Sequence, residues 1–296
     1  MKTSAAQGGA RGAWITAGPA LAWLLVFLGF PLLLIAAASG LTRGDYGDFG
    51  LPVTGENYAR LAGWTELGFD PLYPRILARS VVMGAATTLL CLVLGTPLAF
   101  CIARLPGRWR SLVLTLVIVP FWTNLLIRTY GWQMLLAPGA PLSRAAAALG
   151  FIAPGDGLYP GWLAVGLGMV CDFLPFLVLP LYASVEKLDW TLAEAAADLG
   201  APPVRVFWHA ILPQIRPGLA AGAALVFLPA TGQFVVPDLL GGARTLMLGN
   251  AIQQQFGASR DWPFGAAMAC VTLALMMAAA GVRFWRDRSG VVEGGR

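Results

Sequence analysis

The stretch EKLDWTLAEAAADLGAPPVRVFWHAILP, residues 186–213, is a polar segment between two apolar ones. Thr191 followed three residues later by Glu194 is a capping-box pattern, in which each residue satisfies a backbone N–H at the start of a helix. The pattern predicts a helix that begins at Leu192. The flanking sequence on both sides is apolar, so this polar helix separates two apolar segments of the chain.

The helix is expected to end at Gly200, because glycine readily adopts the left-handed conformation of a helix C-terminus. Pro202 prevents its continuation, and Pro203 can occupy the first turn of a second helix that runs toward Pro213. The product is a helix, a glycine turn and a helix, carrying charges of both signs and exposed apolar side chains. Such a projection suits recognition in which a helix lies in a groove of a partner protein.

The composition is that of a protein that crosses a membrane several times. Of the 296 residues, 57% are hydrophobic and 12% are charged, whereas soluble domains have about a quarter charged residues. The net charge of +5 does not indicate a nucleic-acid partner, because the basic residues form short clusters beside apolar runs. The four cysteines lie in apolar runs without metal-ligand spacing, so neither a metal site nor a catalytic cluster is expected.

Six apolar runs are long enough to cross a bilayer. They cover residues 14–41, 80–103, 111–130, 161–184, 217–236 and 264–283. The first run is too long for a signal peptide, so we expect an uncleaved helix after a short tail at 1–13. The sequence therefore predicts an all-α membrane protein with six transmembrane helices.

Both ends of the chain are expected in the cytoplasm. An even number of crossings puts both termini on one side, and basic residues mark the cytoplasmic side. The clearest mark is the turn after the second span, which holds Arg104, Arg108 and Arg110. The tail at 286–296 is also basic. The segment 186–217 is nearly neutral, so its cytoplasmic placement rests on the number of crossings.

The polar segment carries a spaced motif: Glu-Ala-Ala, three residues, Gly, nine residues, then Ala-Ile-Leu-Pro. The motif residues are Glu194, Ala195, Ala196, Gly200, Leu212 and Pro213. This pattern resembles the signature of permease subunits of bacterial ABC importers, in which Ile is usual at the position of Ala210. The resemblance implies a coupling helix that inserts into a groove of a cytoplasmic ATPase. An ordinary amphipathic loop helix is the alternative.

Further motifs narrow the resemblance. They are 120–122 (PFW), 126–132 (LIRTYGW), 174–176 (LPF), 179–182 (LPLY), 232–237 (GQFVVP), 239–242 (LLGG) and 261–263 (DWP). Over residues 80–283 the chain is similar to spermidine/putrescine permeases. The resemblance implies a type I ABC importer permease fold with a core at 80–285, in a multi-pass protein of the bacterial inner membrane.

The resemblance also implies the partners of the chain. They are a cytoplasmic ABC ATPase dimer, a second homologous permease subunit and a periplasmic solute-binding protein, with the lipid bilayer around the spans. The chain has no phosphate-cradling lysine motif. ATP is therefore expected on the ATPase subunit, and the permease itself is expected to hold no cofactor and to be no enzyme.

Five residues are candidates for the substrate path: Asp172, Gln233, Trp122, Tyr130 and Asp238. A carboxylate within a span is costly, so Asp172 is expected to meet an ammonium group of the cargo or to pair with Arg128 or a partner subunit. Gln233 could bind cargo or a neighbouring helix. The aromatic pair could attract cations by cation–π contact or form an interfacial belt. Asp238 could attract cations at the outer mouth.

We expect the cargo to be a polyamine, putrescine or spermidine. In this family the position of Gln233 is often Glu, so an anionic contact for a cation is expected to be weaker here. The alternatives are another small solute, amino-acid-like or opine-like, in the same importer class, or a stand-alone secondary transporter. The last would require more intramembrane charge than Asp172 supplies.

Overall fold

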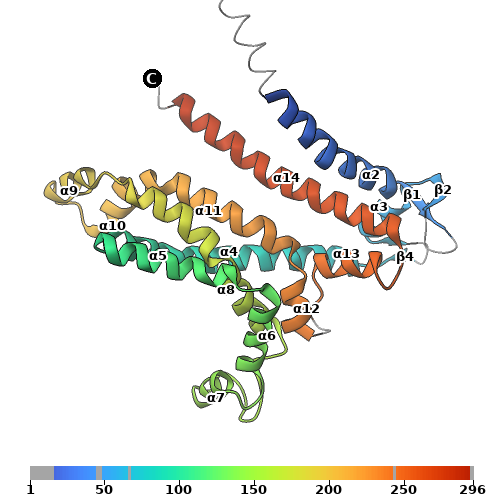
Figure 1. Cartoon of the computed structure of the whole chain (residues 1–296), viewed down its shortest axis with the longest axis horizontal. Helices are drawn as coiled ribbons and strands as arrows, with labels where there is room; N and C mark the ends of the chain where they lie inside the picture. The colour runs from blue at the N-terminus through green and yellow to red at the C-terminus, as the bar shows by residue number, and fades with distance from the viewer. Residues whose placement is uncertain (1–16, 45–48, 66–67, 243–244, 294–296) are drawn as a thin grey trace, which may run out of the picture. The chain divides into compact units, whose positions relative to one another are not determined.

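The computed structural model describes residues 17–44, 49–65, 68–242 and 245–293, and they are mostly helical (Figure 1). The expected tail at 1–13 and the first residues of the expected first span lie outside the described residues. The chain divides into two compact units, residues 1–73 with 252–281 and residues 74–251 with 282–296.

The first unit combines two long apolar helices with a small polar region. A π-helical turn, η1 (Leu25–Gly29), continues into α2 (Phe30–Ser39), and α14 (Trp262–Glu293) starts in this unit. Between them the chain forms β1 (Leu41–Arg43), β2 (Phe49–Val53), α3 (Glu56–Leu61), β3 (Trp64–Thr65) and β4 (Gly68–Phe69). The strands pair as two antiparallel hairpins, β1 with β2 and β3 with β4. Much of the chain between the first two predicted spans thus forms short strands and a helix.

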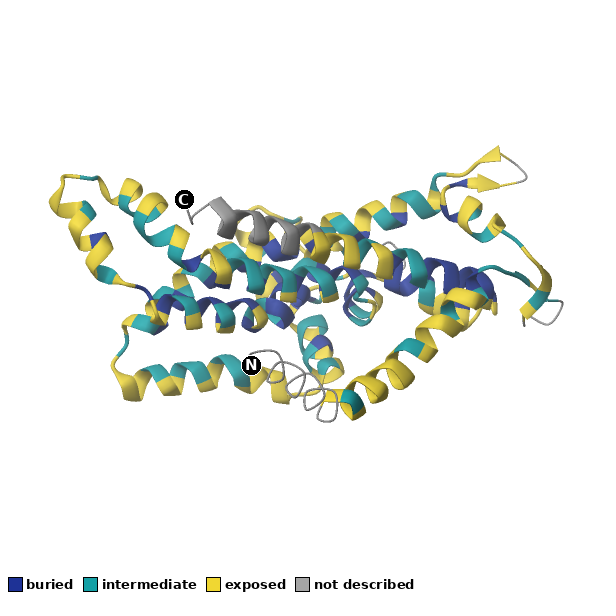
Figure 2. Cartoon of the chain, turned by 90° about the horizontal axis from the view of Figure 1, so that it is seen from above, coloured by how far each residue is buried: buried dark blue, intermediate teal, exposed yellow. Residues whose placement is uncertain are grey.

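The second unit contains the remaining helices. They are α4 (Leu72–Arg104), α5 (Gly107–Trp122), α6 (Leu125–Leu136), α7 (Pro141–Ala148), α8 (Trp162–Glu186), α9 (Trp190–Asp198), α10 (Pro203–Val206), η2 (Phe207–Ile211), α11 (Leu212–Gly232), α12 (Val235–Gly241) and α13 (Leu248–Phe256). The first residues of α4 and the last of α13 belong to the first unit. Buried residues concentrate along α8, which packs against α11, α12, α6 and α5 (Figure 2).

The predicted crossings are largely confirmed. Within the described residues, five helices are long and apolar enough to span a membrane: Ala17–Ser39, Leu72–Arg104, Trp162–Glu186, Pro203–Gly232 and Trp262–Gly281. The sixth predicted span is a pair of helices, α5 and α6, that meet at an angle of 95°. Counting this pair as one broken span gives the six crossings that the sequence predicts.

The helices differ from the predicted spans in three places. The helix that carries the second span begins at Leu72 and continues through Arg75 and Arg79 before the apolar run. The third is not one straight helix, since the chain is extended at Thr123 and Asn124. The fifth is one continuous helix from Pro203 to Gly232, not 217–236, and Gln233 is already extended.

Small residues set the closest helix contact in the second unit. Gly218 and Gly222 are spaced as in a GxxxG motif, which lets helix backbones approach each other. A Cβ atom on Gly222 would lie 3.0 Å from the carbonyl oxygen of Leu177 and 3.1 Å from its Cα, both on α8. At Gly218 the added atom would meet Ser184. The contact between α8 and α11 therefore depends on the absence of side chains at these two positions.

We expect Gly222→Leu to lower the thermal midpoint of the purified chain in detergent by several degrees. Overpacking costs about 1–3 kcal/mol, and each kcal/mol moves the midpoint by about 2–4 °C in chains of 150–250 residues. Gly281→Leu is the matched control, because a Cβ there meets nothing within 4 Å. Equal midpoints for the two variants would contradict the proposed role of this contact.

Candidate functional site

The polar segment after α8, residues 189–213, forms two short helices joined by a turn. We call these residues the projection. The first is α9, and its N-cap is Asp189, not the predicted Thr191 with Glu194. One oxygen of Asp189 accepts hydrogen bonds from the backbone N–H (3.0 Å) and the hydroxyl (2.7 Å) of Thr191. The helix therefore begins two residues earlier than predicted, because a carboxylate upstream of the threonine takes the capping role.

Gly200 ends α9 as predicted. Its φ is +79°, and two backbone hydrogen bonds close the helix end around it. The Ala201 N–H donates to the Ala196 carbonyl at 3.1 Å, and the Gly200 N–H donates to the Ala197 carbonyl at 2.8 Å. This pair is a Schellman motif, which requires a left-handed residue at the position of Gly200. Pro203 then starts the second helix, also as predicted.

The projection exposes apolar side chains to solvent. Leu199 is 89% exposed, Val204 69% and Trp208 58%. Among the predicted coupling residues, Glu194, Ala195, Gly200 and Pro213 are exposed, and Ala196 and Leu212 are half-buried. Exposed apolar groups gathered on one polar, structured element are typical of a protein-binding surface. The geometry thus suits docking, and the coupling role of these residues stays a prediction.

A buried ion pair joins the broken third span to α8. The Arg128 Nε on α6 lies 2.6 Å from Oδ1 of Asp172 on α8, and the Asp172 side chain is only 5% exposed. A second nitrogen of Arg128 donates to the Pro120 carbonyl on α5 at 2.7 Å. One guanidinium therefore contacts both sides of the 95° bend and the neighbouring helix. This is the paired arrangement that the sequence left open as an alternative for Asp172.

The second interruption lies at Gln233, between α11 and α12. Its side-chain oxygen accepts from the Phe234 N–H at 3.1 Å, and the Asn250 amide donates to the Phe234 carbonyl at 2.8 Å. The short helix α12 that follows packs against α6 and α8. Interrupted helices inside a membrane protein are common at substrate sites, since freed backbone groups and helix ends face the ligand.

The other candidates for the substrate path are not brought into one contact set. Trp122 at the end of α5 is 85% exposed and Tyr130 on α6 is 50% exposed, and Asp238 is exposed on α12. No hydrogen bond or ion pair joins these three to Asp172 or Gln233 among the described residues. Their role in binding cargo therefore stays a prediction.

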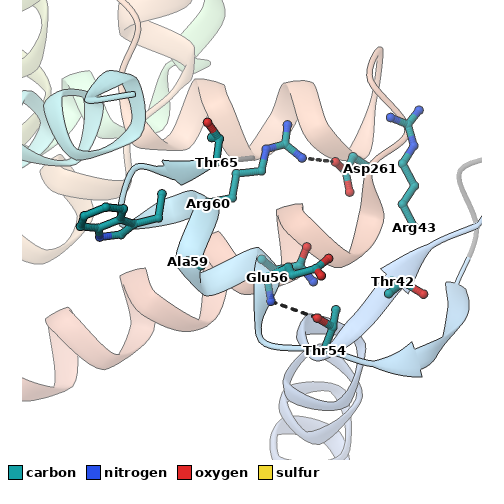
Figure 3. Close-up of a pocket in the computed structure, with 10 residues that line it drawn as sticks. Thr42, Arg43, Thr54, Glu56, Ala59, Arg60, Thr65 and Asp261 are labelled. Carbon is teal, nitrogen blue, oxygen red and sulfur yellow. Dashed lines mark hydrogen bonds and ion pairs between the residues drawn. The ribbon is translucent and has the colours of Figure 1, made fainter. Parts of the chain in front are cut away.

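The first unit has a polar cleft of about 490 Å³, drawn in Figure 3. Its wall is fixed by Arg60, whose guanidinium pairs with Asp261 at 2.8 Å and lies 4.1 Å from the ring centre of Phe264. Asp261 also accepts from the Phe264 N–H at 3.3 Å near the start of α14. The DWP motif at 261–263 thus has a structural role in anchoring the last span to the polar region.

The sequence analysis did not identify three polar residues that bond backbone groups at helix ends: Asn124, Asn250 and Gln214. Asn124 caps α6 by accepting from the Leu126 N–H at 2.8 Å, and its place before an apolar run was a usable signal. Asn250 and Gln214 act on backbone groups far along the chain, which no local pattern indicates. Among the described residues no cluster of His, Cys, Asp and Glu could hold a metal ion.

Together these features define an integral membrane protein, with helices long and apolar enough to span a membrane, one bent pair of helices and one exposed helical projection. Residues 92–289 match the family model described as "Binding-protein-dependent transport system inner membrane component". The chain belongs to this family. It is an ABC importer permease, a transport subunit and not an enzyme, and a multi-pass protein of the inner membrane. The stand-alone secondary transporter that the sequence left open is therefore set aside.

Three relatives illustrate the similarity. The spermidine/putrescine transport system permease protein PotB of Salmonella typhimurium (strain SL1344) is 46% identical over 264 residues, with 89% of each chain covered. PotB of Escherichia coli (strain K12) is 45% identical, with 89% of this chain and 93% of that chain covered. The inner membrane ABC transporter permease protein YdcU of the same strain is 32% identical, with 88% and 84% covered.

Solved structures show the same fold at lower identity. A crystal structure of a bacterial ABC transporter involved in the import of the acidic polysaccharide alginate matches with a TM-score of 0.65 at 16% identity, covering 95% of this chain and 98% of that chain. The same type of transporter in complex with an alginate pentasaccharide-bound periplasmic protein matches with a TM-score of 0.66, covering 92% and 93%. These matches confirm the predicted type I permease fold.

We expect Asp172→Asn and Arg128→Gln each to destabilise the purified chain, because removing one partner of a buried pair costs about 3–5 kcal/mol. The double variant leaves no uncompensated charge and should recover most of the loss. Thermal unfolding in detergent measures all three. Arg110→Gln is the control, since its pair with Glu186 is 35% and 43% exposed and exposed pairs contribute about 0–1 kcal/mol. If the double variant lost as much stability as the two single variants together, the result would contradict the pairing.

Proposed function

We propose that this chain is one of two permease subunits of an ATP-driven importer that carries polyamines across the bacterial inner membrane. The observation that carries the proposal is the projection at 189–213, an exposed helix pair with a left-handed glycine at its turn. The cargo assignment is supported by PotB relatives at 46% and 45% identity, against 32% for YdcU.

In the proposed assembly, an ATPase dimer receives the projection in a groove, and a second homologous permease completes the pathway. A periplasmic binding protein delivers the cargo. Closure of the ATPase pair on ATP would move the projections together and shift the spans between two conformers. Such coupling requires that ATP-bound ATPase prefers one conformer, because equal affinity for both shifts nothing.

The proposed orientation places both termini and the projection in the cytoplasm. Two contacts support it by joining the basic turn after α4 to the projection. Arg110 pairs with Glu186 at 3.1 Å, and Arg104 lies 5.5 Å from the ring centre of Trp190. Basic turns favour the cytoplasmic side. The turn and the projection therefore share one face, so the placement no longer rests on the number of crossings alone.

For the cargo we propose a path beside the two interrupted helices, with Asp172 and Gln233 as polar contacts and Trp122, Tyr130 and Asp238 toward its outer end. One oxygen of Asp172, Oδ2, has no hydrogen-bond partner within the described residues. A buried carboxylate oxygen of this kind can accept from an ammonium group. Arg128 neutralises the carboxylate at rest, which keeps the empty path free of an uncompensated charge.

We expect Gly200→Val to abolish uptake of labelled spermidine and putrescine while the protein inserts at wild-type levels. A β-branched residue held in the left-handed region costs about 1–3 kcal/mol, so the turn opens and the projection loses its shape. A Cβ at this position meets nothing within 4 Å, which leaves the backbone as the only source of strain.

Gly107→Val is the matched control, since that Cβ also meets nothing within 4 Å. Uptake is measured in proteoliposomes that hold the permease pair, the ATPase and the binding protein. Co-purification of the ATPase with each variant gives a readout independent of the cargo. Normal uptake of labelled polyamine by Gly200→Val would count against the docking role. If the wild-type transporter hydrolysed ATP but imported neither labelled spermidine nor labelled putrescine, the result would count against the proposed cargo.

A further inference from the structure

A single glutamine, Gln214, joins the first and last parts of the projection by hydrogen bonds. Gln214 lies near the start of α11, and its side-chain oxygen accepts from the backbone N–H of Asp189 at 3.0 Å. Its amide nitrogen lies 3.4 Å from the Asp189 carbonyl and donates to the Ala210 carbonyl at 2.8 Å. One side chain thus contacts the N-cap residue of α9 and the helix that leaves the projection.

The chain otherwise offers a hinge at this place. Helix α8 ends at Glu186, α9 starts at Trp190, and residues 187–189 between them are not helical. The other end of the projection has no such gap, because one helix runs from Pro203 to Gly232. Leu188 is buried there and α9 packs against η2, so loss of the Gln214 contact would weaken, without abolishing, the link between α9 and α11.

The same residue supports an irregular stretch of the exit helix. Pro213 has no backbone N–H, so the His209 carbonyl lacks its usual partner four residues on. The chain adopts the π-helical turn η2 immediately before it. The bond from Gln214 to the Ala210 carbonyl lies at the end of this turn and links it to Asp189. A π-helical turn is often a functional feature of a helix.

Other contacts also hold α9, which packs against η2 and α10 and buries Ala193. Trp190 lies 6.5 Å from the Phe100 ring, measured between ring centres, and it faces Arg104 on the same helix, α4. Both of these last contacts are made by side chains. By contrast, the hydrogen bond from the Asp189 N–H to Gln214 fixes the orientation of the start of α9 as well as its distance from α11.

We propose that Gln214 is the positioning residue that makes α9 and α11 move as one body, so that displacement of the projection reaches the membrane. The inference rests on the proposed function of the projection as the docking site for the ATPase. It predicts a defect in coupling rather than in docking when the contact is lost.

The test compares Gln214→Leu with wild type in the reconstituted transporter. We expect the ATPase to co-purify and hydrolyse ATP, whereas labelled polyamine imported per ATP falls by about fivefold or more, the scale of one or two lost hydrogen bonds. A merely structural role would lower uptake and hydrolysis in parallel and leave the ratio unchanged. Gln214→Glu keeps the acceptor oxygen for the Asp189 N–H but replaces the donor to the Ala210 carbonyl with an oxygen, so it should recover only part of the ratio. Gln254→Leu, exposed on α13, is the matched control.

A second measurement does not depend on cargo or ATPase. Spin labels at Leu192 on α9 and Leu225 on α11, both exposed, are introduced after replacement of the native cysteines. The distance distribution between them should be narrow in wild type and broad in Gln214→Leu. An unchanged distribution together with an unchanged coupling ratio would overturn the proposal for Gln214. Failure of wild type to bind the ATPase would instead overturn the proposed function.

Discussion

Hydrocarbon offers no hydrogen-bond partners, so each backbone group that leaves a helix within the membrane must find a partner in the protein. The bent pair α5–α6 and the break after α11 satisfy this constraint with polar side chains from other helices or the adjoining loop. Arg128 donates to the Pro120 carbonyl, Asn124 caps α6, and Asn250 donates to the Phe234 carbonyl. Side chains from several helices therefore stabilise the two helix breaks.

The same constraint relates the interruptions to transport. A continuous helix has no free backbone groups to offer a solute, whereas the ends of α5, α6, α11 and α12 do. Asp172 supplies the charge that holds the first interruption, and α12 packs against both α6 and α8 next to the second. Helix α8 packs against α6 beside the first break and against α12 beside the second. In the proposed function, α8 and α11 would connect the projection to the path.

Much of this architecture follows from the sequence because its causes are local. Apolar runs predicted the spans, and Gly200 predicted the helix end whose φ is +79°. The break at Thr123 and Asn124 was missed because apolar residues on both sides read as one span. Leu72–Arg79 lay outside the predicted second span because its arginines are polar, although a helix can extend beyond the bilayer. The pair of Asp172 with Arg128 was one of the alternatives that the sequence left open. The contact of Gln214 with Asp189 joins distant positions, so no local pattern could specify it.

The proposed function requires that the projection faces the cytoplasm, where an ATPase can bind it. A cysteine at Leu199, which is 89% exposed, tests this directly in a variant without the native cysteines. A maleimide that cannot cross membranes should label it in inside-out vesicles and leave it unlabelled in intact spheroplasts. Labelling of spheroplasts would place the projection on the outer face and contradict the account.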